Sequence, residues 1–238
     1  RQREGGELVR LLGERLDALS QLQSRETLLR WHALVHAGAW PTLVRELLEL
    51  AACAPSGTNI QPWRVYALSG KDKEALSQAI LAKHEKGESD GEQSGLEYYP
   101  KEWVEPWLSR RRKCGLGLYS LLGIEKGDAA RMKAQGGRNF IFFDAPVGLI
   151  FTFDNRLGKG MLVDCGMFLG NLMTAARARG LDTCAQAYFA DYHRTIRTTL
   201  GIPDNEIVYC GMALGYADPD APENKLILMT GPMTGTFG

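Results

Sequence analysis

The run Val147-Gly148-Leu149-Ile150-Phe151 most constrains the fold, because it contains no polar residue. A strand with one face in water alternates apolar and polar side chains, so a continuously apolar strand is covered on both faces. Two further strands are expected, over residues 65–68 and 207–214. Several helical patterns lie between these few strands, and this combination predicts an α+β fold.

Apolar residues at three- and four-residue steps predict the helices. The helix that begins at Pro41 ends before Pro55, because a residue that precedes proline is disfavoured in the helical conformation. One helix is apolar on nearly all sides, and its Gly166 and Gly170 share a face where another backbone can approach closely. The predicted helices cover residues 8–22, 41–54, 72–83, 102–122, 161–179 and 191–200.

The segments between these elements are polar. Residues 85–95 are acidic, contain glycine and carry almost no apolar side chain, which predicts an exposed loop. The tail from Asp218 onward is rich in proline and is expected to be extended. We therefore expect a helical N-terminal extension over residues 1–40 and a single domain over residues 41–238.

Composition argues against several classes of partner. The formal net charge is zero, so neither nucleic acid nor an anionic membrane is an expected partner. The best candidate for a membrane span, residues 161–178, contains Asp164, Asn171 and Arg177. No signal peptide is recognised at the start of the sequence. The five cysteines are odd in number and scattered, which favours reduced thiols in a cytoplasmic protein.

Two further motifs are more consistent with structural roles than with ligand binding. The run Gly115-Leu116-Gly117 begins like a dinucleotide fingerprint, but it lacks the third glycine and follows a basic run instead of a strand. His32 and His36 have the spacing of two metal ligands on a helix, yet no third ligand accompanies them, so surface histidines are preferred and no metal is expected. Hydrolase signatures such as Gly-x-Ser-x-Gly do not occur.

The stretch from Ala54 to Trp63 reads Ala-Pro-Ser-Gly-Thr-Asn-Ile-Gln-Pro-Trp and lies between a predicted helix and a predicted strand. Gly57 permits backbone conformations that other residues resist. Ser56, Thr58, Asn59 and Gln61 place four hydrogen-bonding side chains in six positions. Such a loop either faces a polar ligand or is a turn held by its own hydrogen bonds.

This stretch resembles the flavin-contacting loop of the nitroreductase family. Three further blocks agree and occur in the family's order. They are Asn139-Phe140 with Phe143-Asp144-Ala145-Pro146-Val147-Gly148-Leu149, Gly180-Leu181-Asp182-Thr183-Cys184 with Leu200-Gly201-Ile202-Pro203, and Cys210-Gly211-Met212-Ala213-Leu214-Gly215-Tyr216-Ala217. The resemblance covers residues 41–226. It implies bound FMN, a mixed, mainly antiparallel central sheet flanked by helices, and an intertwined homodimer.

The resemblance also implies which residues bind the flavin. In the first loop they are Pro55, Ser56, Gly57, Asn59 and Gln61, with Asn59 hydrogen-bonded to the polar edge of the ring. Residues 185–187, which include Gln186 and Ala187, are expected beside the ring, where a backbone N–H could contact the reactive nitrogen and stabilise developing charge. An ordinary helix-to-strand loop is the alternative for residues 185–187.

One part of the family pattern is missing. Similar proteins carry an Arg-Arg-Ser-x-Arg type motif that pairs with the flavin phosphate, and here only Arg30 matches it. The other positions fall on Leu29, Trp31 and Ala33. A second family arginine, expected beside Pro232, is also absent. Candidates that could replace these cations are Arg25, His32, His36 and Lys225.

The resemblance implies that NAD(P)H gives a hydride to the flavin and that a nitroaromatic, quinone or similar small aromatic acceptor then takes the electrons, with ping-pong kinetics. Trp103, Trp107 and Tyr119 are candidates for shaping the acceptor pocket, and core packing is their alternative role. Two other functions stay open. One is a related flavin reaction such as reductive dehalogenation, and the other is a flavin-poor binding protein without catalysis.

Overall fold

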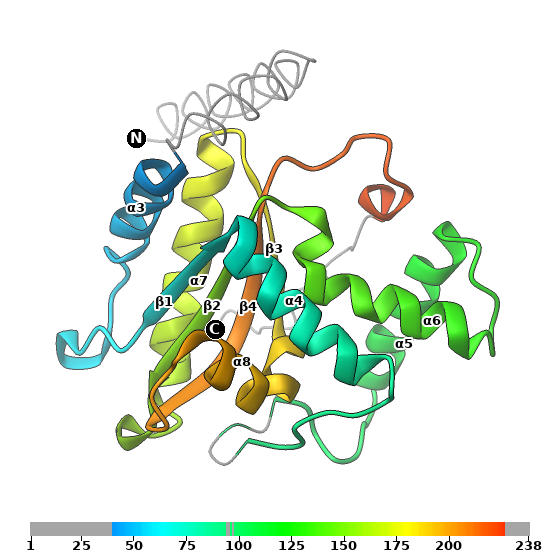
Figure 1. Cartoon of the computed structure of the whole chain (residues 1–238), viewed down its shortest axis with the longest axis horizontal. Coiled ribbons are helices and arrows are strands. Elements are labelled where there is room, and N and C mark those ends of the chain that lie inside the picture. The colour runs from blue at the N-terminus through cyan, green and yellow to red at the C-terminus, as the bar shows by residue number, and fades with distance from the viewer. Residues whose placement is uncertain (1–39, 94–95, 97, 227–238) are drawn as a thin grey trace, which may run out of the picture.

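The computed structural model describes residues 40–93, 96 and 98–226 (Figure 1). The described α-helices are α3 (Trp40–Ala51), α4 (Gly70–His84), α5 (Trp107–Leu121), α6 (Ala129–Gly137), α7 (Met161–Ala178) and α8 (His193–Leu200). The strands are β1 (Arg64–Ser69), β2 (Val147–Asp154), β3 (Asp182–Gln186) and β4 (Glu206–Gly215). Short 3-10 turns are η1 (Gly57–Asn59), η2 (Arg138–Asp144), η3 (Asn155–Leu157), η4 (Ala187–Tyr192) and η5 (Pro222–Lys225).

The four strands form one sheet in the order β1-β2-β4-β3, and every neighbouring pair is antiparallel. β1 and β3 are therefore the two edges of the sheet. The prediction of an α+β fold with a mainly antiparallel sheet is confirmed.

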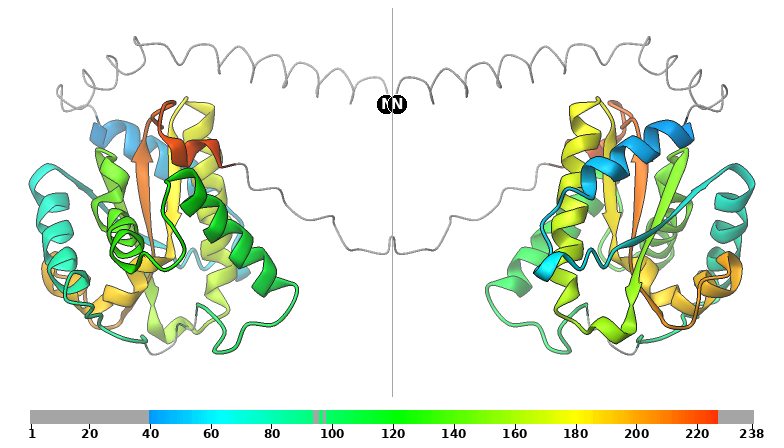
Figure 2. Two further views of the ribbon diagram at one scale, coloured as in Figure 1. Left: turned by 90° about the vertical axis from the view of Figure 1, so that its right-hand side faces the viewer. Right: turned by 90° about the vertical axis from the view of Figure 1, so that its left-hand side faces the viewer.

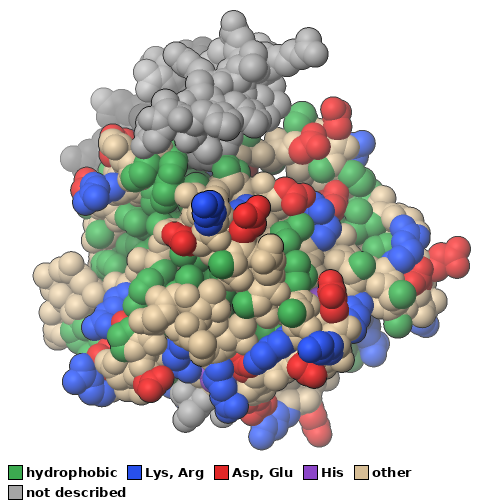
Figure 3. Space-filling view, viewed as in Figure 1, with side chains coloured by type: hydrophobic (Ala, Val, Ile, Leu, Met, Phe, Trp, Pro, Cys, Tyr) green, Lys and Arg blue, Asp and Glu red, His purple; other side chains and the backbone are tan. Residues whose placement is uncertain are grey.

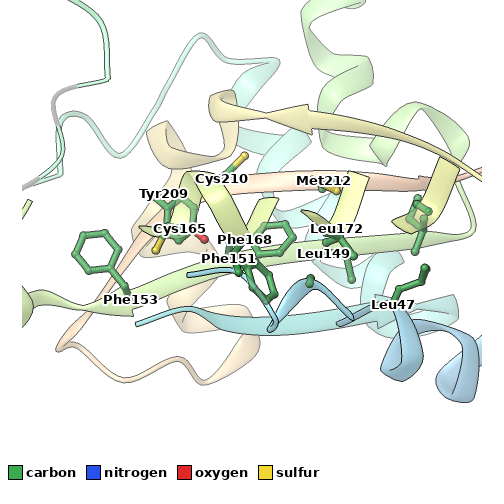
Figure 4. Packing of buried hydrophobic residues seen from close by; sticks show 14 of the residues in the cluster. Leu47, Leu149, Phe151, Phe153, Cys165, Phe168, Leu172, Tyr209, Cys210 and Met212 are labelled. Carbon is green, nitrogen blue, oxygen red and sulfur yellow. The ribbon is translucent and has the colours of Figure 1, made fainter. Parts of the chain in front are cut away.

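Helices cover both faces of this sheet, as the apolar run in β2 predicts, and all eight residues of β2 are buried. Leu149 and Phe151 point into a core shared with α3 and α7, while Ile150 between them points into a second core with α4 and α8. Figure 4 shows the first core, where the labelled side chains are Leu47, Leu149, Phe151, Phe153, Cys165, Phe168, Leu172, Tyr209, Cys210 and Met212.

The predicted helices are present where the structure describes the chain, but several boundaries differ. α5 begins at Trp107 instead of residue 102, because Pro106 lies immediately before it and disfavours helical backbone in the residue it follows. α8 begins at His193 instead of residue 191. Neither β3 nor α6 was predicted, since each is short and has a weak apolar pattern. The predicted helix over residues 8–22 lies outside the described residues.

The prediction that residues 85–95 form an exposed loop is wrong for two of them. Asp90 and Gln93 are buried, at 9% and 6% relative exposure. Asp90 Oδ2 accepts a hydrogen bond of 2.7 Å from the backbone N–H of Thr195 in α8. The Gln93 amide accepts from Val208 N at 3.1 Å and donates to Val208 O at 2.8 Å. These polar side chains are buried because distant backbone groups satisfy them.

The described part of the tail, residues 218–226, contains the turn η5 and is otherwise irregular. Within the part of the chain that the structure describes, no helix is long and apolar enough to span a membrane. The same residues include no group of three or more His, Cys, Asp or Glu side chains that could hold a metal ion.

Candidate functional site: a strained loop and the end of β3

The loop from Ala54 to Trp63 joins α3 to β1 and is bent by its own polar groups. Ser56 Oγ accepts from the backbone N–H of Gln61 at 3.0 Å, and Gln61 Nε2 donates to Asn59 Oδ1 at 2.9 Å. Thr58, Asn59 and Gln61 all have positive φ. Non-glycine residues in this region cost about 1–3 kcal/mol each, and such strain clusters at binding sites. Pro55, Gly57, Asn59 and Gln61 are exposed and Ser56 is half-buried.

A buried carboxylate fixes this loop to the body of the protein. The backbone N–H of Gly57 donates to Asp164 Oδ2 at 3.1 Å. Asp164 lies in the first turn of α7 and is 6% exposed. A carboxylate is favoured there because the helix N-terminus carries positive partial charge. The sequence signal for Asp164 is an acidic residue within an otherwise apolar helix.

The exit of the loop is fixed by a second buried acid, Glu206. Its carboxylate accepts from Arg64 Nη1 at 2.5 Å, from Tyr66 Oη at 3.0 Å and from the hydroxyl of Thr152. Glu206 is 1% exposed and connects β4 to the start of β1, the strand that follows the loop. This network holds the start of β1 against β2 and β4, and therefore holds one end of the loop.

The second predicted contact lies at the end of β3. Gln186 is 3% exposed, and its Nε2 donates to the backbone carbonyl of Asn139 at 2.8 Å. Its Oε1 is buried and has no hydrogen-bond partner among the described residues. Asn139 in turn donates from Nδ2 to Gly136 O at 3.0 Å. Asn139 was part of a resembling block but was not predicted as a site residue.

These groups fit the polar edge of a flavin, which presents an N–H between carbonyl oxygens. The unpartnered Gln186 Oε1 is an acceptor for such an N–H, and a buried acceptor left without a donor costs about 1–3 kcal/mol. The exposed side-chain amides of Asn59 and Gln61 each carry an N–H donor and a carbonyl acceptor. The side chains present therefore include acceptors and donors of the kinds that could pair with this edge of the ring.

The structure does not bring the two groups of predicted contacts together within one chain. The first loop leads into β1, whereas Gln186 and Ala187 follow β3 at the other edge of the sheet (Figure 1). Three strand spacings separate the two edges, about 14 Å at 4.8 Å per spacing. Arg30 lies outside the described residues, as do the other candidate phosphate ligands Arg25, His32 and His36. Lys225 is described and exposed.

The three predicted pocket aromatics are also separated. Tyr119 lies near Tyr188, which directly follows Ala187: burial, Asp191 and Tyr119 raise the pKa of Tyr188. Trp107 lies 12 residues earlier on α5, about 18 Å away at 1.5 Å per residue. Trp103 precedes α5 and packs against Tyr99 and Arg111.

Comparison with known proteins finds similar enzymes. The chain is 39% identical over 184 residues to nitrobenzene nitroreductase of Ectopseudomonas oleovorans, covering 77% of this chain and 81% of that one. It is 41% identical over 184 residues to 4-nitrobenzoate reductase of Pseudomonas putida, covering 77% and 79%.

Solved structures agree as well. The FMN and NADPH-dependent nitroreductase NfnB from Sphigopyxis sp. strain HMH superposes with a TM-score of 0.76 at 35% identity, covering 80% of this chain and 85% of that one. NfnB from Mycobacterium smegmatis, solved in complex with NADPH, superposes with a TM-score of 0.76 at 28% identity, covering 82% of this chain and 87% of that one. The sequence profile of the nitroreductase family matches residues 41–216. The chain therefore belongs to the nitroreductase family.

Proposed function

We propose that this protein is an FMN-dependent oxidoreductase that moves a hydride from NAD(P)H through the flavin to a nitroaromatic, quinone or similar acceptor. The observation that carries the proposal is the buried Gln186 Oε1 at the C-terminal end of β3, which has no partner among the described residues. Nitroaromatic acceptors are favoured because two relatives near 40% identity are named for nitrobenzene and 4-nitrobenzoate.

In this proposal the chain binds and orients, and FMN when bound supplies the hydride chemistry. Gln186 Oε1 would accept from the ring N–H, and the backbone N–H of Ala187 would donate to the reactive nitrogen. Ser56, Asn59 and Gln61 would contact the ring from the first loop, which Asp164 holds in place through Gly57. Arg30 binds the phosphate. No side chain is required to act as an acid or base.

The site is complete only in a homodimer, because the first loop and Gln186 lie at opposite edges of one sheet. Two exposed apolar surfaces are available to contact a partner subunit. On α7, Val163 is 68% and Met173 is 39% exposed, and side chains at Gly166 or Gly170 would meet nothing within 4 Å. A hollow between α3 and β1 is mainly apolar, and hydrophobic side chains gather over these elements in Figure 3.

The dimer is tested by replacing Gly170 with Leu, since the isolated chain has room for the side chain. Sedimentation equilibrium should give a dimer for the wild type and a weakened or absent dimer for Gly170→Leu, with unchanged circular dichroism. Gln78→Leu adds a leucine to an exposed site on α4 and is the matched control. A wild-type monomer that still binds FMN would contradict the two-chain site.

The cofactor and reaction are tested on the purified protein. Heat release should yield about one FMN per chain, and the holoenzyme should oxidise NADPH or NADH with nitrobenzene or 4-nitrobenzoate as acceptor. A halogenated acceptor preferred over every nitro compound would favour reductive dehalogenation. A colourless protein that takes up no added FMN would favour the non-catalytic binding role. The five free thiols support a cytoplasmic location.

A further inference from the structure

A buried histidine at the end of α4 joins the two segments that meet at Gln186. His84 is 7% exposed. Its Nε2 lies 2.9 Å from the backbone carbonyl of Lys133 in α6, and its Nδ1 lies 3.1 Å from the Tyr192 hydroxyl at the end of η4. A carbonyl only accepts hydrogen bonds, so Nε2 carries the hydrogen and Nδ1 of the neutral ring accepts from Tyr192. His84 therefore connects α4 to both α6 and η4.

The bond to Lys133 fixes the end of α6, where a glycine lets the His84 ring approach the backbone. A Cβ on Gly137 would lie 3.3 Å from this ring. The next turn, η2, lies with α4 on the face of the sheet opposite α7 (Figure 2). In η2 the ring of Phe140 is fully buried, and its centroid lies 5.1 Å from that of His84. The His84 ring therefore packs beside the chain both at the end of α6 and in η2.

Asn139, in this segment, connects it to the proposed flavin contact. Its side chain donates to Gly136 O at 3.0 Å, and its backbone carbonyl accepts from Gln186 Nε2 at 2.8 Å. Because that carbonyl has no hydrogen to donate, the amide nitrogen of Gln186 must face it, and the buried Oε1 is left to accept from a ligand. The direction of the Gln186 acceptor therefore depends on where the chain places the Asn139 carbonyl.

The other segment, η4, is anchored without His84. Phe189 in η4 stacks on Phe142 with ring centroids 4.7 Å apart. A Cβ on Gly211 would overlap the Phe189 ring, so this ring covers β4 at the residue paired with Gln186. Of the two hydrogen bonds of His84, the bond to α6 is therefore the one on which the position of Gln186 depends more.

We propose that His84 is a positioning residue for bound FMN. Through the Lys133 carbonyl it fixes the end of α6, and it thereby aims the Gln186 acceptor at the N–H of the flavin ring. The inference rests on the flavin contact of Gln186 in the proposed function. If the end of α6 moves, the Gln186 amide loses the Asn139 carbonyl and can turn to present its own N–H. Two donors would then face each other at the ring.

The test compares FMN with 3-methyl-FMN, in which a methyl group replaces the hydrogen of that N–H. Quenching of flavin fluorescence by the apoprotein gives both dissociation constants. The wild type should bind FMN roughly tenfold more tightly, the worth of about one hydrogen bond to a buried acceptor. Gln186→Leu has no such acceptor and defines the ratio that remains without it. His84→Phe keeps a ring but makes neither hydrogen bond, so its ratio should fall to that of Gln186→Leu.

Two substitutions that differ by one methylene isolate the bond to Lys133. The amide of His84→Gln can reach the Lys133 carbonyl from the position of Nε2, and this variant should keep most of the preference for FMN. The amide of His84→Asn reaches only the position of Nδ1, and this variant should lose the preference. Tyr192→Phe removes the other bond of His84 and should keep the preference.

Leu76→Ala is the control for a general loss of stability. Leu76 is fully buried and lies about two turns before His84 on the same helix. This change leaves a cavity, so it should lower the temperature of thermal unfolding. The preference for FMN over 3-methyl-FMN should stay that of the wild type.

The apoprotein gives a second measurement that needs no flavin. In isotope-labelled protein, the Gln186 side-chain amide is the NMR signal that Gln186→Leu lacks. Its proton bonded to Asn139 O should move upfield in His84→Phe and His84→Asn, because that hydrogen bond is lost. The signal should stay in place in Leu76→Ala.

The inference is overturned if His84→Phe and His84→Asn keep the wild-type preference and the wild-type amide signal. It is also overturned if Leu76→Ala loses the preference to the same extent. A wild type that binds no FMN, or that does not distinguish FMN from 3-methyl-FMN, would refute the proposed flavin contact instead. The amide signal would then still decide whether His84 positions Gln186.

Discussion

The backbone N–H of Gly57 donates a hydrogen bond of 3.1 Å to Asp164 Oδ2, across 107 residues of sequence. The bond joins an exposed, strained loop to the buried first turn of α7. Because the loop lies at one edge of the sheet, its position depends on this carboxylate as well as on its own short hydrogen bonds.

Replacing Asp164 with Ala should weaken FMN binding about tenfold or more, since a hydrogen bond to a charged group is worth roughly 1.5–3 kcal/mol. Asp164→Asn keeps an oxygen acceptor and should lose much less. Quenching of FMN fluorescence on titration with apoprotein measures both dissociation constants. If Asp164→Ala binds FMN as tightly as the wild type, Asp164 does not position a flavin-binding loop.

Glu206→Leu should lower the free energy of unfolding by about 2–4 kcal/mol, because it leaves the hydroxyls of Tyr66 and Thr152 without their buried acceptor. The comparison is Arg64→Gln, which removes the ion-pair partner of Glu206. Because the Arg64 side chain is 48% exposed, this change should lower the free energy of unfolding by less than about 1 kcal/mol. Urea denaturation monitored by circular dichroism measures the difference. Equal losses for the two variants would contradict this ranking.

The stability of the fold should fall as the pH is lowered below about 6.5, the ordinary pKa of histidine. Burial and the charge of Arg197 lower the pKa of His193, whose Nδ1 accepts from Arg197 Nη1 at 2.9 Å. Asp90 opposes this shift, while Arg194 and Lys83 add to it. When folding lowers the pKa of a group, its contribution to stability is fully present above the pKa of the unfolded state. That contribution is lost as the pH falls through the pKa of the folded state.

His193→Gln should flatten this dependence between pH 7.5 and 5.5. Urea midpoints at the two pH values provide the measurement, with the wild type run in parallel. A wild-type midpoint that rises on acidification over this range would be the opposite of the expected sign.

Gly148→Ala should destabilise the protein by about 1–3 kcal/mol, since its Cβ would lie 2.6 Å from the ring of buried Phe142. Gly115→Ala is the matched control, because a Cβ there meets nothing within 4 Å on helix α5. That change should be neutral or stabilising by up to about 1 kcal/mol. Thermal unfolding of the two variants compares them directly, and a stable Gly148→Ala protein would imply that Phe142 can move.

Arg30→Ala should reduce FMN affinity, because the family resemblance assigns Arg30 to the phosphate. Ala33→Arg restores a second family cation and should increase affinity. Titration with riboflavin, which lacks the phosphate, is the control and should not distinguish the variants. An unchanged FMN affinity in both variants would mean that other groups bind the phosphate.

Local patterns in the sequence were sufficient to predict much of the fold. The apolar run of β2 predicted cover on both faces, and Pro41 and Pro55 bracket α3 within a few residues. β3 was missed because five residues, Asp182–Gln186, carry too little pattern to distinguish them from a loop. Its pairing with β4 is a long-range property.

The candidate site depends even more on long-range contacts. The loop residues from Pro55 to Gln61 came from a resemblance, and their assignment to the flavin stays a prediction. Asp164 and Asn139 were not predicted, because their partners Gly57 and Gln186 lie far away in sequence. Asp90 was assigned to an exposed loop for the same reason: a polar residue is buried when a distant backbone group satisfies it.

β3 is half as long as β4, so among the described strands none lies beside the outer edge of β4 near Val208. The amide of Gln93 binds both the N–H and the C=O of Val208, as a residue of an adjacent strand would. An open strand edge is a template for pairing with other chains. Gln93 thus occupies an edge with which another chain could otherwise pair, and we expect its loss to appear as turbidity in concentrated solution before any change in turnover.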